Sequence, residues 1–174
     1  QPYIVSEFID GNTLSNFLSL KELSIDKVLD IFIQILSALK PAHEAGIIHR
    51  DIKPDNVKIR RDGIVKVLDF GLAKLGQDSV ETDSEASTKI KKLTVDGMIL
   101  GTPQYIAPEQ SRGQQVDQRA DFFSCGVLLY EMISGKLPFD GASSLDIIGS
   151  ILKDEPKALS EIVPDVPHDL ERIV

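Results

Sequence analysis

The chain of 174 residues has an ordinary globular composition, with 42% hydrophobic and 26% charged residues, which argues against a disordered segment. Its formal net charge of −8 at pH 7 disfavours a broad surface for nucleic acids or anionic membranes, but it is compatible with a local basic pocket. The single cysteine, Cys125, excludes an internal disulfide framework and a zinc site built from several cysteines. No apolar run approaches the roughly 18 residues of a membrane span, so membrane contact is not indicated in this segment.

The first residues predict a short strand, a turn and a short helix. β-branched and aromatic residues indicate a strand over residues 3–8. The Asp-Gly-Asn sequence at 10–12 is typical of a turn that ends such a strand. A short helix is expected to follow over residues 14–18.

A longer helix is predicted next. From Ser24, an N-cap residue, apolar side chains recur in steps of three and four as far as Gly46, which is typical of a helix end. Pro41 has no N–H for the helical hydrogen bond, so we expect a kink or early fraying there. His43 and His168 are lone histidines, for which structural or surface roles are expected.

A β-hairpin and further helices make up the rest of the chain. Strands are predicted at 57–59 and 64–67, and the Asp-Gly dipeptide at 62–63 is typical of a two-residue hairpin turn. Residues 75–92 are polar and without periodicity, which indicates a long loop. Helices are expected over 119–134 and 144–153 and from about residue 167 onward.

The open end of this hairpin collects the residues suited to phosphate chemistry. With a two-residue turn at 62–63, the pairing register places Asn56 opposite Asp69. An amide oxygen and a carboxylate are hard ligands of the kind that Mg²⁺ takes together with substrate phosphates. Asp51 and Lys53 precede Asn56 on the same loop. A carboxylate, a cation and a metal site at one place favour phosphoryl transfer, which depends on positioning and charge neutralisation.

Three motifs, in this order along the chain, resemble those of a eukaryotic-type Ser/Thr protein kinase. The segment 104–110 is similar to that of bacterial members of the family. The sequence His-Arg-Asp-Ile-Lys-Pro-Asp-Asn at 49–56 resembles the catalytic loop of that family. The Asp-Phe-Gly triplet at 69–71 resembles its metal-binding motif, and Ala-Pro-Glu at 107–109 resembles the end of its activation segment. Gly-Thr-Pro at 101–103 and the Lys-Pro pair after the catalytic aspartate are similar to the Ser/Thr class. The resemblance covers nearly the whole chain.

The resemblance implies a catalytic group and a metal site. Asp51 would accept the proton of the substrate hydroxyl or orient that hydroxyl for attack. Lys53 would neutralise charge on the γ-phosphate of ATP, and Thr102 would brace both residues. Asn56 and Asp69 would hold Mg²⁺ and so contact the bound nucleotide.

The resemblance also implies a site for the nucleotide base. Glu7 to Ile9 would form the hinge whose backbone groups bind adenine, and Asp10 or Thr13 would lie near the ribose. Lys58 stands where the family usually has an apolar floor under adenine, and its aliphatic stem is able to serve as one.

Regulatory and structural roles follow from the same resemblance. Arg50 would receive a phosphorylated activation loop, for which Thr94 is the favoured phosphorylation site, whereas other loop hydroxyls are expected to be solvating. Cys125 is expected to be a core residue. The structural positions implied are His49 and Phe70 as packing elements of the active state, Glu109 at the end of the activation segment, and Asp121 as an anchor for the backbone amides of the catalytic loop.

The predicted fold class is α+β, a protein-kinase-like fold with a mostly helical C-terminal lobe and a small hairpin. Residues 1–13 would be the hinge and 14–174 the C-terminal lobe, with the activation segment at 69–109. The sequence contains no glycine-rich loop and no strand lysine of the N-terminal lobe. We therefore expect a partial domain, truncated at both ends, with an exposed apolar surface on the hinge and hairpin facing the absent lobe.

The predicted function is a serine/threonine protein kinase that uses ATP and Mg²⁺ to phosphorylate hydroxyls of a protein substrate, the isolated chain being inactive. The alternative is a non-catalytic kinase remnant or docking module. A small-molecule phosphotransferase is disfavoured, because those enzymes lack the segment that seats a peptide. Partners are the protein substrate, ATP and the N-terminal lobe, with no nucleic acid. The expected location of this segment is cytoplasmic, with a membrane anchor elsewhere in the parent protein left open.

Overall fold

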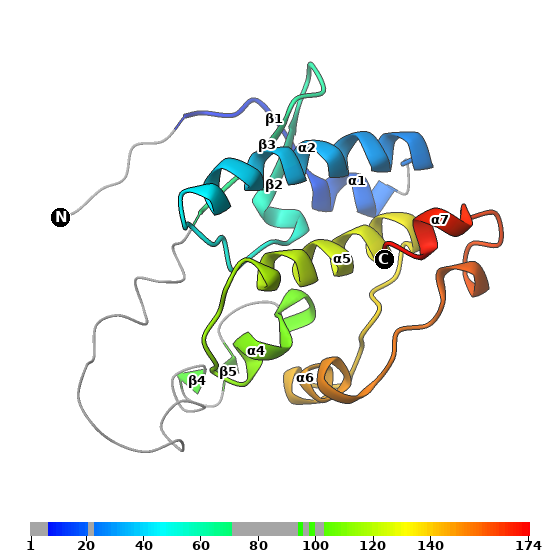
Figure 1. Cartoon of the computed structure of the whole chain (residues 1–174). Helices are drawn as coiled ribbons and strands as arrows, with labels where there is room; N and C mark the ends of the chain where they lie inside the picture. Colours follow the sequence, from blue (N-terminus) through cyan, green and yellow to red (C-terminus); the bar gives the residue numbers. More distant parts are fainter. Residues whose placement is uncertain (1–6, 21–22, 71–93, 96–97, 100–102) are drawn as a thin grey trace.

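The structure is a computed structural model that describes residues 7–20, 23–70, 94–95, 98–99 and 103–174. It is a mixed α/β arrangement, as predicted, in which helices outnumber short strands among the described residues. The elements drawn in Figure 1 are β1 (Gly11–Thr13), α1 (Leu14–Leu20), α2 (Ile25–Glu44), β2 (Val57–Arg60), β3 (Val65–Val67), β4 (Thr94–Val95), β5 (Met98–Ile99), α4 (Pro108–Ser111), α5 (Arg119–Ser134), α6 (Ser144–Lys153) and α7 (His168–Glu171).

Helix α2 begins as predicted and passes through its proline. The hydroxyl oxygen of Ser24 accepts a hydrogen bond from the backbone N–H of Lys27, which satisfies one of the donors left open in the first turn. Pro41 does not end the helix, which continues to Glu44, so the expectation of early fraying is wrong. Because Pro41 lies in the last turn, few later residues depend on the missing hydrogen bond. The chain then leaves the helix through Gly46 at φ 73°.

The hairpin is part of a three-stranded antiparallel sheet with the order β1-β2-β3. The prediction of a turn at residues 10–12 is therefore wrong, since Gly11 begins strand β1 and pairs with Arg60. A Cβ atom on Gly11 would lie 2.2 Å from the carbonyl oxygen of Ile59. Glycine here permits a close approach of two backbones, which the sequence pattern alone does not distinguish from a turn.

The register of the hairpin differs by one residue from the prediction. Val57 pairs with Val67 and Ile59 with Val65, so the loop between the strands has three residues. The N–H of Gly63 donates to the carbonyl of Arg60, and Gly63 has φ 84°. This is a three-residue hairpin loop that ends in a left-handed glycine, which extends the expected Asp-Gly turn by one residue.

The N-terminal strand and the long loop are tested only in small part. Of the strand predicted over residues 3–8, only Glu7 and Phe8 are described, and these two residues form no strand. Residues 75–92 lie outside the described residues. Two short strands, β4 at residues 94–95 and β5 at residues 98–99, pair antiparallel.

Helix α5 is the central element of the helical part. It lies between α2 and the helices α4 and α6 in Figure 1, and it contacts α2 and α4. Its predicted bounds are confirmed, and it ends at Gly135, which has φ 66°. The predicted bounds of α6 are also confirmed. The core is built mainly from α2 and α5, whose buried apolar side chains include Val28, Ile31, Ile35, Leu39, Cys125, Val127, Leu128 and Leu129.

None of the helices in the described part of the chain combines the length and the apolarity that crossing a bilayer requires.

Gly11→Ala tests the close approach of β1 and β2. We expect this substitution to lower the free energy of unfolding by about 1–3 kcal/mol, because the new methyl group meets the backbone of Ile59. Gly126→Ala is the matched control: it lies within α5 and nothing comes within 4 Å of its added Cβ. Alanine there is expected to be neutral or stabilising by up to about 1 kcal/mol. Urea unfolding measures both, and equal effects would contradict the close approach.

Candidate active site

The side chains of the predicted catalytic loop converge on Asp51. The ammonium of Lys53 lies 2.8 Å from Oδ2 of Asp51, and the amide nitrogen of Asn56 donates to the same oxygen at 2.9 Å. Asn56 also donates to the backbone carbonyl of Asp51 at 2.8 Å. The Asp51 side chain is 46% exposed, whereas that of Lys53 is 18% exposed. The site therefore presents an oriented carboxylate to solvent, next to a largely buried positive charge.

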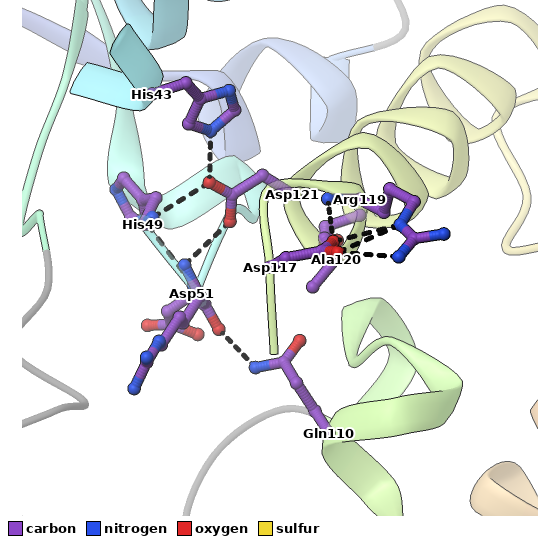
Figure 2. A network of polar contacts seen from close by, with 10 residues as sticks. His43, His49, Asp51, Gln110, Asp117, Arg119, Ala120 and Asp121 are labelled. Atoms are coloured by element: carbon purple, nitrogen blue, oxygen red, sulfur yellow. Dashed lines mark hydrogen bonds and ion pairs between the residues drawn. The ribbon is translucent and has the colours of Figure 1, made fainter. Parts of the chain in front are cut away.

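The buried carboxylate of Asp121 fixes the backbone of this loop. Its Oδ2 accepts from the N–H of His49 at 2.8 Å, as Figure 2 shows. Its Oδ1 accepts from the N–H of Arg50 at 2.7 Å. Arg50 has φ 69°, a left-handed conformation that is unfavourable for a residue with a side chain. Charge-assisted hydrogen bonds to the two successive amides stabilise this backbone. Asp121 comes from the first turn of α5, so the central helix positions the catalytic loop.

His43 completes the environment of Asp121. Its Nε2 lies 2.7 Å from Oδ2 of Asp121, and its side chain is 6% exposed. Because the carboxylate only accepts, Nε2 carries the hydrogen of this bond. The sequence predicts a structural or surface role for His43, because it has no ligand partners at metal spacing. The available signal was its place in the last turn of the helix that leads into the catalytic loop.

His49 connects the catalytic loop with Leu68, which directly follows strand β3, and with Phe70. Its Nε2 lies 2.6 Å from the carbonyl oxygen of Leu68, and its Nδ1 accepts from the N–H of Asp51 at 3.3 Å. This pattern requires a neutral ring that carries its hydrogen on Nε2. The ring of Phe70 packs on that of His49 with centroids 4.7 Å apart. His49 and Phe70 thus join the two motifs in the interior.

Asn56 and Asp69 both lie at the open end of the hairpin, but they are not directly opposite each other as predicted. Asn56 lies opposite Leu68, whose N–H donates to the Asn56 carbonyl at 2.8 Å. Asp69 comes one residue later, is exposed, and has φ 60°. The one-residue error follows from the three-residue hairpin loop. Both residues still come from the open end of the hairpin.

The donor set at this end fits a metal ion that is shared with a ligand. Both hydrogen bonds of the Asn56 side chain come from Nδ2, which directs Oδ1 away from Asp51. Together with the exposed Asp69, it offers two hard oxygen ligands. Among the described residues, no three His, Cys, Asp or Glu side chains gather to hold a metal. A Mg²⁺ ion here would therefore need further oxygens, such as those of phosphate groups.

The predicted base-binding residues lie beside the sheet. The carbonyl of Ile9 accepts from Nζ of Lys58 at 3.3 Å. The Glu7 carboxylate lies 3.2 Å from Nζ of Lys66. Thr13 pairs with Lys58 across β1 and β2. Contacts with Lys58 and Lys66 thus bring Glu7, Ile9 and Thr13 to the three-stranded sheet.

The surface of the hinge and hairpin, which we expect to be apolar and exposed, is apolar only in part. Phe8, between the two hinge residues, is 87% exposed. The adjoining face of the sheet carries lysines instead. Phe8 of the hinge and the exposed Ile64 of the hairpin agree with the expectation, whereas Lys58 and Lys66 on the sheet do not.

The residues after the activation segment contact the catalytic loop through Gln110. Its Nε2 donates to the carbonyl of Arg50 at 2.9 Å, and its Oε1 accepts from the N–H of Ala107. Figure 2 shows Gln110 reaching from α4 toward the loop. The motifs predict no role for Gln110, although it directly follows Glu109. Thr102 lies outside the described residues, and the side chain of Thr94 is not described.

Tyr105 and Glu131 form a polar pair that the sequence pattern does not predict. The hydroxyl of Tyr105 donates a short hydrogen bond to the carboxylate of Glu131, and the backbone carbonyl of Tyr105 accepts from Ser124 at 2.7 Å. Burial raises the pKa of Tyr105, and the neighbouring Glu131 raises it further. Burial also raises the pKa of Glu131, with the charge of Asp55 adding to it and the Tyr105 bond opposing it. The pair fixes the segment after the activation loop to α5.

The fold and the site together are those of a protein kinase domain: a helical body, a small sheet, and a catalytic loop held against the central helix. The model of the protein kinase domain matches residues 1–171, and the chain belongs to this family.

Three bacterial relatives illustrate the similarity. A probable serine/threonine-protein kinase of Streptomyces coelicolor is 42% identical over 174 residues, which cover 99% of this chain and 24% of the relative. The probable serine/threonine-protein kinase PknB of Lactococcus lactis is 38% identical over 175 residues, with 100% and 26% covered. A serine/threonine-protein kinase of Myxococcus xanthus is 39% identical over 179 residues, with 100% and 24% covered. The chain spans about a quarter of the length of these relatives.

Asp121→Asn tests the anchor of the catalytic loop. We expect the free energy of unfolding to fall by about 1–3 kcal/mol. Both oxygens of Asp121 accept hydrogen bonds, whereas asparagine has one oxygen, and its NH₂ group would face a buried N–H that is then left without an acceptor. Asp117→Asn is the control, since Asp117 is exposed and pairs with Arg119 on the surface. That substitution should leave stability nearly unchanged. Urea unfolding compares them, and a loss of the same size in both would argue against the anchor.

Tyr105→Phe tests the buried pair through its pH dependence. The pKa of Tyr105 is raised above its ordinary value of 10.0, so the unfolded chain loses this proton before the folded protein does. Stability is therefore present below about pH 10 and is lost as the pH rises further. We expect the unfolding free energy to fall more between about pH 9 and about pH 11 in the wild type than in the variant. Equal losses in urea unfolding at the two pH values would contradict the prediction.

Proposed function

We propose that the full-length protein containing this chain is a serine/threonine protein kinase that transfers the γ-phosphate of ATP to hydroxyl groups of a protein substrate. The observation that carries the proposal is the carboxylate of Asp51, held by Lys53 and Asn56 and exposed at its outer side. Membership of the protein kinase family and the printed names of the relatives support it.

The residues of the chain divide the work of transfer between them. Asp51 accepts the proton of the attacking substrate hydroxyl or orients that hydroxyl. The hydroxyl oxygen bonds to the γ-phosphorus of ATP while the bond between the γ-phosphorus and the β-phosphate oxygen breaks, and ADP leaves. Lys53, 2.8 Å from Asp51, neutralises charge on the transferred group. Asn56 and Asp69 would hold Mg²⁺, which supplies charge neutralisation on the phosphates when bound.

The choice of serine and threonine rests on the Lys-Pro pair at 53–54 and on Thr102. Lys53 and Pro54 belong to the described residues, and the ammonium of Lys53 lies 2.8 Å from Oδ2 of Asp51. The relatives are named serine/threonine-protein kinases, which favours the same class here.

The proposal extends to the surroundings of the site. Phosphate-covering elements of the family do not occur in these 174 residues, so we assign ATP binding to the full-length protein rather than to this chain alone. Arg50 and Thr94 remain proposed regulatory residues. We place the segment in the cytoplasm, where ATP is available, and expect no nucleic-acid partner because of the net charge of −8.

Asp51→Asn in the full-length protein tests the function. With Mg²⁺ and ATP, we expect phosphorylation of a protein substrate to fall at least about a hundredfold, because the amide is unable to accept the proton. Asp62→Asn is a matched control, since Asp62 lies in the hairpin loop and pairs with Arg60. It should retain wild-type transfer. Unchanged phosphate incorporation in the Asp51 variant would contradict the catalytic role of Asp51. If neither the wild type nor the control transfers phosphate, the alternative of a non-catalytic kinase remnant or docking module holds.

A further inference from the structure

The side-chain amide of Gln110 has both of its polar atoms occupied, and each contacts a different part of the structure. Its Nε2 donates to the backbone carbonyl of Arg50 at 2.9 Å, and its Oε1 accepts from the backbone N–H of Ala107 at 3.2 Å. Exchange of the oxygen and the nitrogen would bring two donors together at Ala107 and two acceptors together at Arg50, so the amide is held in this orientation. Gln110 therefore forms a bridge from Ala107 to the catalytic loop, and Figure 2 shows its contact with the loop.

The bridge reaches the loop at the residue with the unfavourable backbone conformation. Arg50 has φ 69°, and its N–H donates to Oδ1 of Asp121 at 2.7 Å. Side chains from two helices thus bind both backbone polar groups of Arg50: Asp121 of α5 binds the N–H, and Gln110 of α4 binds the carbonyl. A residue keeps such a conformation only where its surroundings hold it.

The carbonyl of Arg50 belongs to the peptide unit that leads into Asp51. Because a peptide unit is planar, a hydrogen bond that fixes this carbonyl also fixes the N–H of Asp51 on the other side of the same unit. That N–H donates to Nδ1 of His49 at 3.3 Å, which is longer than most hydrogen bonds. The bond from Gln110 is shorter, at 2.9 Å, so it contributes more to the direction in which the Asp51 side chain leaves the backbone.

The other end of the bridge lies in the segment that the resemblance to protein kinases assigns to the seating of a peptide. Ala107 is fully buried and follows the single helical turn at Pro103–Tyr105. This segment is fixed to the central helix, because the backbone carbonyl of Tyr105 accepts from the hydroxyl of Ser124 at 2.7 Å. Gln110 thus connects a fixed segment with the catalytic loop.

We propose that Gln110 is a positioning residue for phosphoryl transfer, which holds the Arg50 carbonyl so that the Asp51 carboxylate meets the substrate hydroxyl in the productive orientation. This rests on the proposed function, in which Asp51 accepts the proton of that hydroxyl or orients it. Gln110 acts through Asp51 and not by contact with the reacting atoms. A catalytic group displaced by about 1 Å loses roughly a hundredfold in rate, so removal of this bond should lower kcat at least about tenfold.

Two substitutions separate the two ends of the bridge. Gln110→Glu keeps an oxygen for the N–H of Ala107, but it places a second oxygen, in place of the donor, against the Arg50 carbonyl. Gln110→Met has a similar length and lacks both hydrogen bonds. If Gln110 only caps α4, the Glu variant is neutral and the Met variant is not, whereas loss of the Arg50 contact impairs both. Gln115→Glu and Gln115→Met, at an exposed position between α4 and α5, are the matched controls.

The test measures transfer from γ-labelled ATP with Mg²⁺ to a general protein substrate by the full-length protein, with each substitution made alone and together with Asp51→Ala. Rates are expressed per nucleotide-binding site, counted by calorimetric titration with a non-hydrolysable ATP analogue, so that unfolded protein does not lower them.

With Asp51 present, we expect both Gln110 variants to lower kcat at least about tenfold, with the KM values for ATP and for the protein within about twofold of the wild type. With Asp51→Ala, we expect them to change the remaining rate less than about twofold, because the carboxylate that Gln110 positions is then absent. The Gln115 variants should keep wild-type values. Where the Asp51→Ala background gives no measurable rate, the separation of kcat from KM decides.

Four results overturn the inference: an unchanged kcat in Gln110→Glu, a higher KM for the protein at unchanged kcat, the same fold loss with and without Asp51, or an equal loss in the Gln115 variants. If Gln110→Met binds no nucleotide, Gln110→Glu alone gives the comparison, because it keeps the cap of α4, and failure of both to bind overturns the inference. Transfer by the wild type with unaffected Gln110 variants contradicts this inference alone. Absence of transfer by the wild type contradicts the proposed function and this inference with it.

Discussion

The carboxylate of Asp121 is the interaction on which the rest of the site depends. It is buried at the start of the central helix and accepts hydrogen bonds from two successive amides of the catalytic loop and from His43. A buried charge without such partners would be costly, so the helix and the loop stabilise each other. The left-handed backbone of Arg50 persists because this anchor holds it.

The anchor explains how a surface loop gains the precision that catalysis needs. Helix α5 is buried and contacts α2, and Asp121 of α5 bonds both to the first amides of the loop and to His43 of α2. Asp51 then follows a fixed backbone, and its carboxylate is held by Lys53 and Asn56. The helical core, the loop and the reactive carboxylate form one continuous set of contacts.

Much of this was predictable because the motifs are local. The Ser24 cap, the bounds of α5 and α6 and the convergence of Asp51, Lys53 and Asn56 follow from residues close together in sequence. Non-local pairings were harder to predict. Glycine occurs both in turns and in close strand pairs, so the pattern predicts a turn where strand β1 lies. The hairpin register shifts by one residue because Arg61 belongs to the loop together with Asp62 and Gly63. The partners of His43 and Gln110 lie 78 and 60 residues away in sequence, so no spacing pattern indicated them.

The sheet shows the same division between local pattern and distant contact. Alternation along β2 predicts which side chains enter the core, but it does not show that Lys58 reaches the carbonyl of Ile9. That contact joins the proposed base site to the strand that leads from Asn56, so the two ends of the proposed nucleotide site share one element.

Phosphoamino-acid analysis of the full-length protein tests the central claim most directly. The protein is incubated with Mg²⁺, γ-labelled ATP and a general protein substrate, and the labelled residues are then identified by mass spectrometry. The account predicts phosphoserine or phosphothreonine that depends on Mg²⁺. Label found only on tyrosine, or no label on protein while ATP is bound, would contradict it.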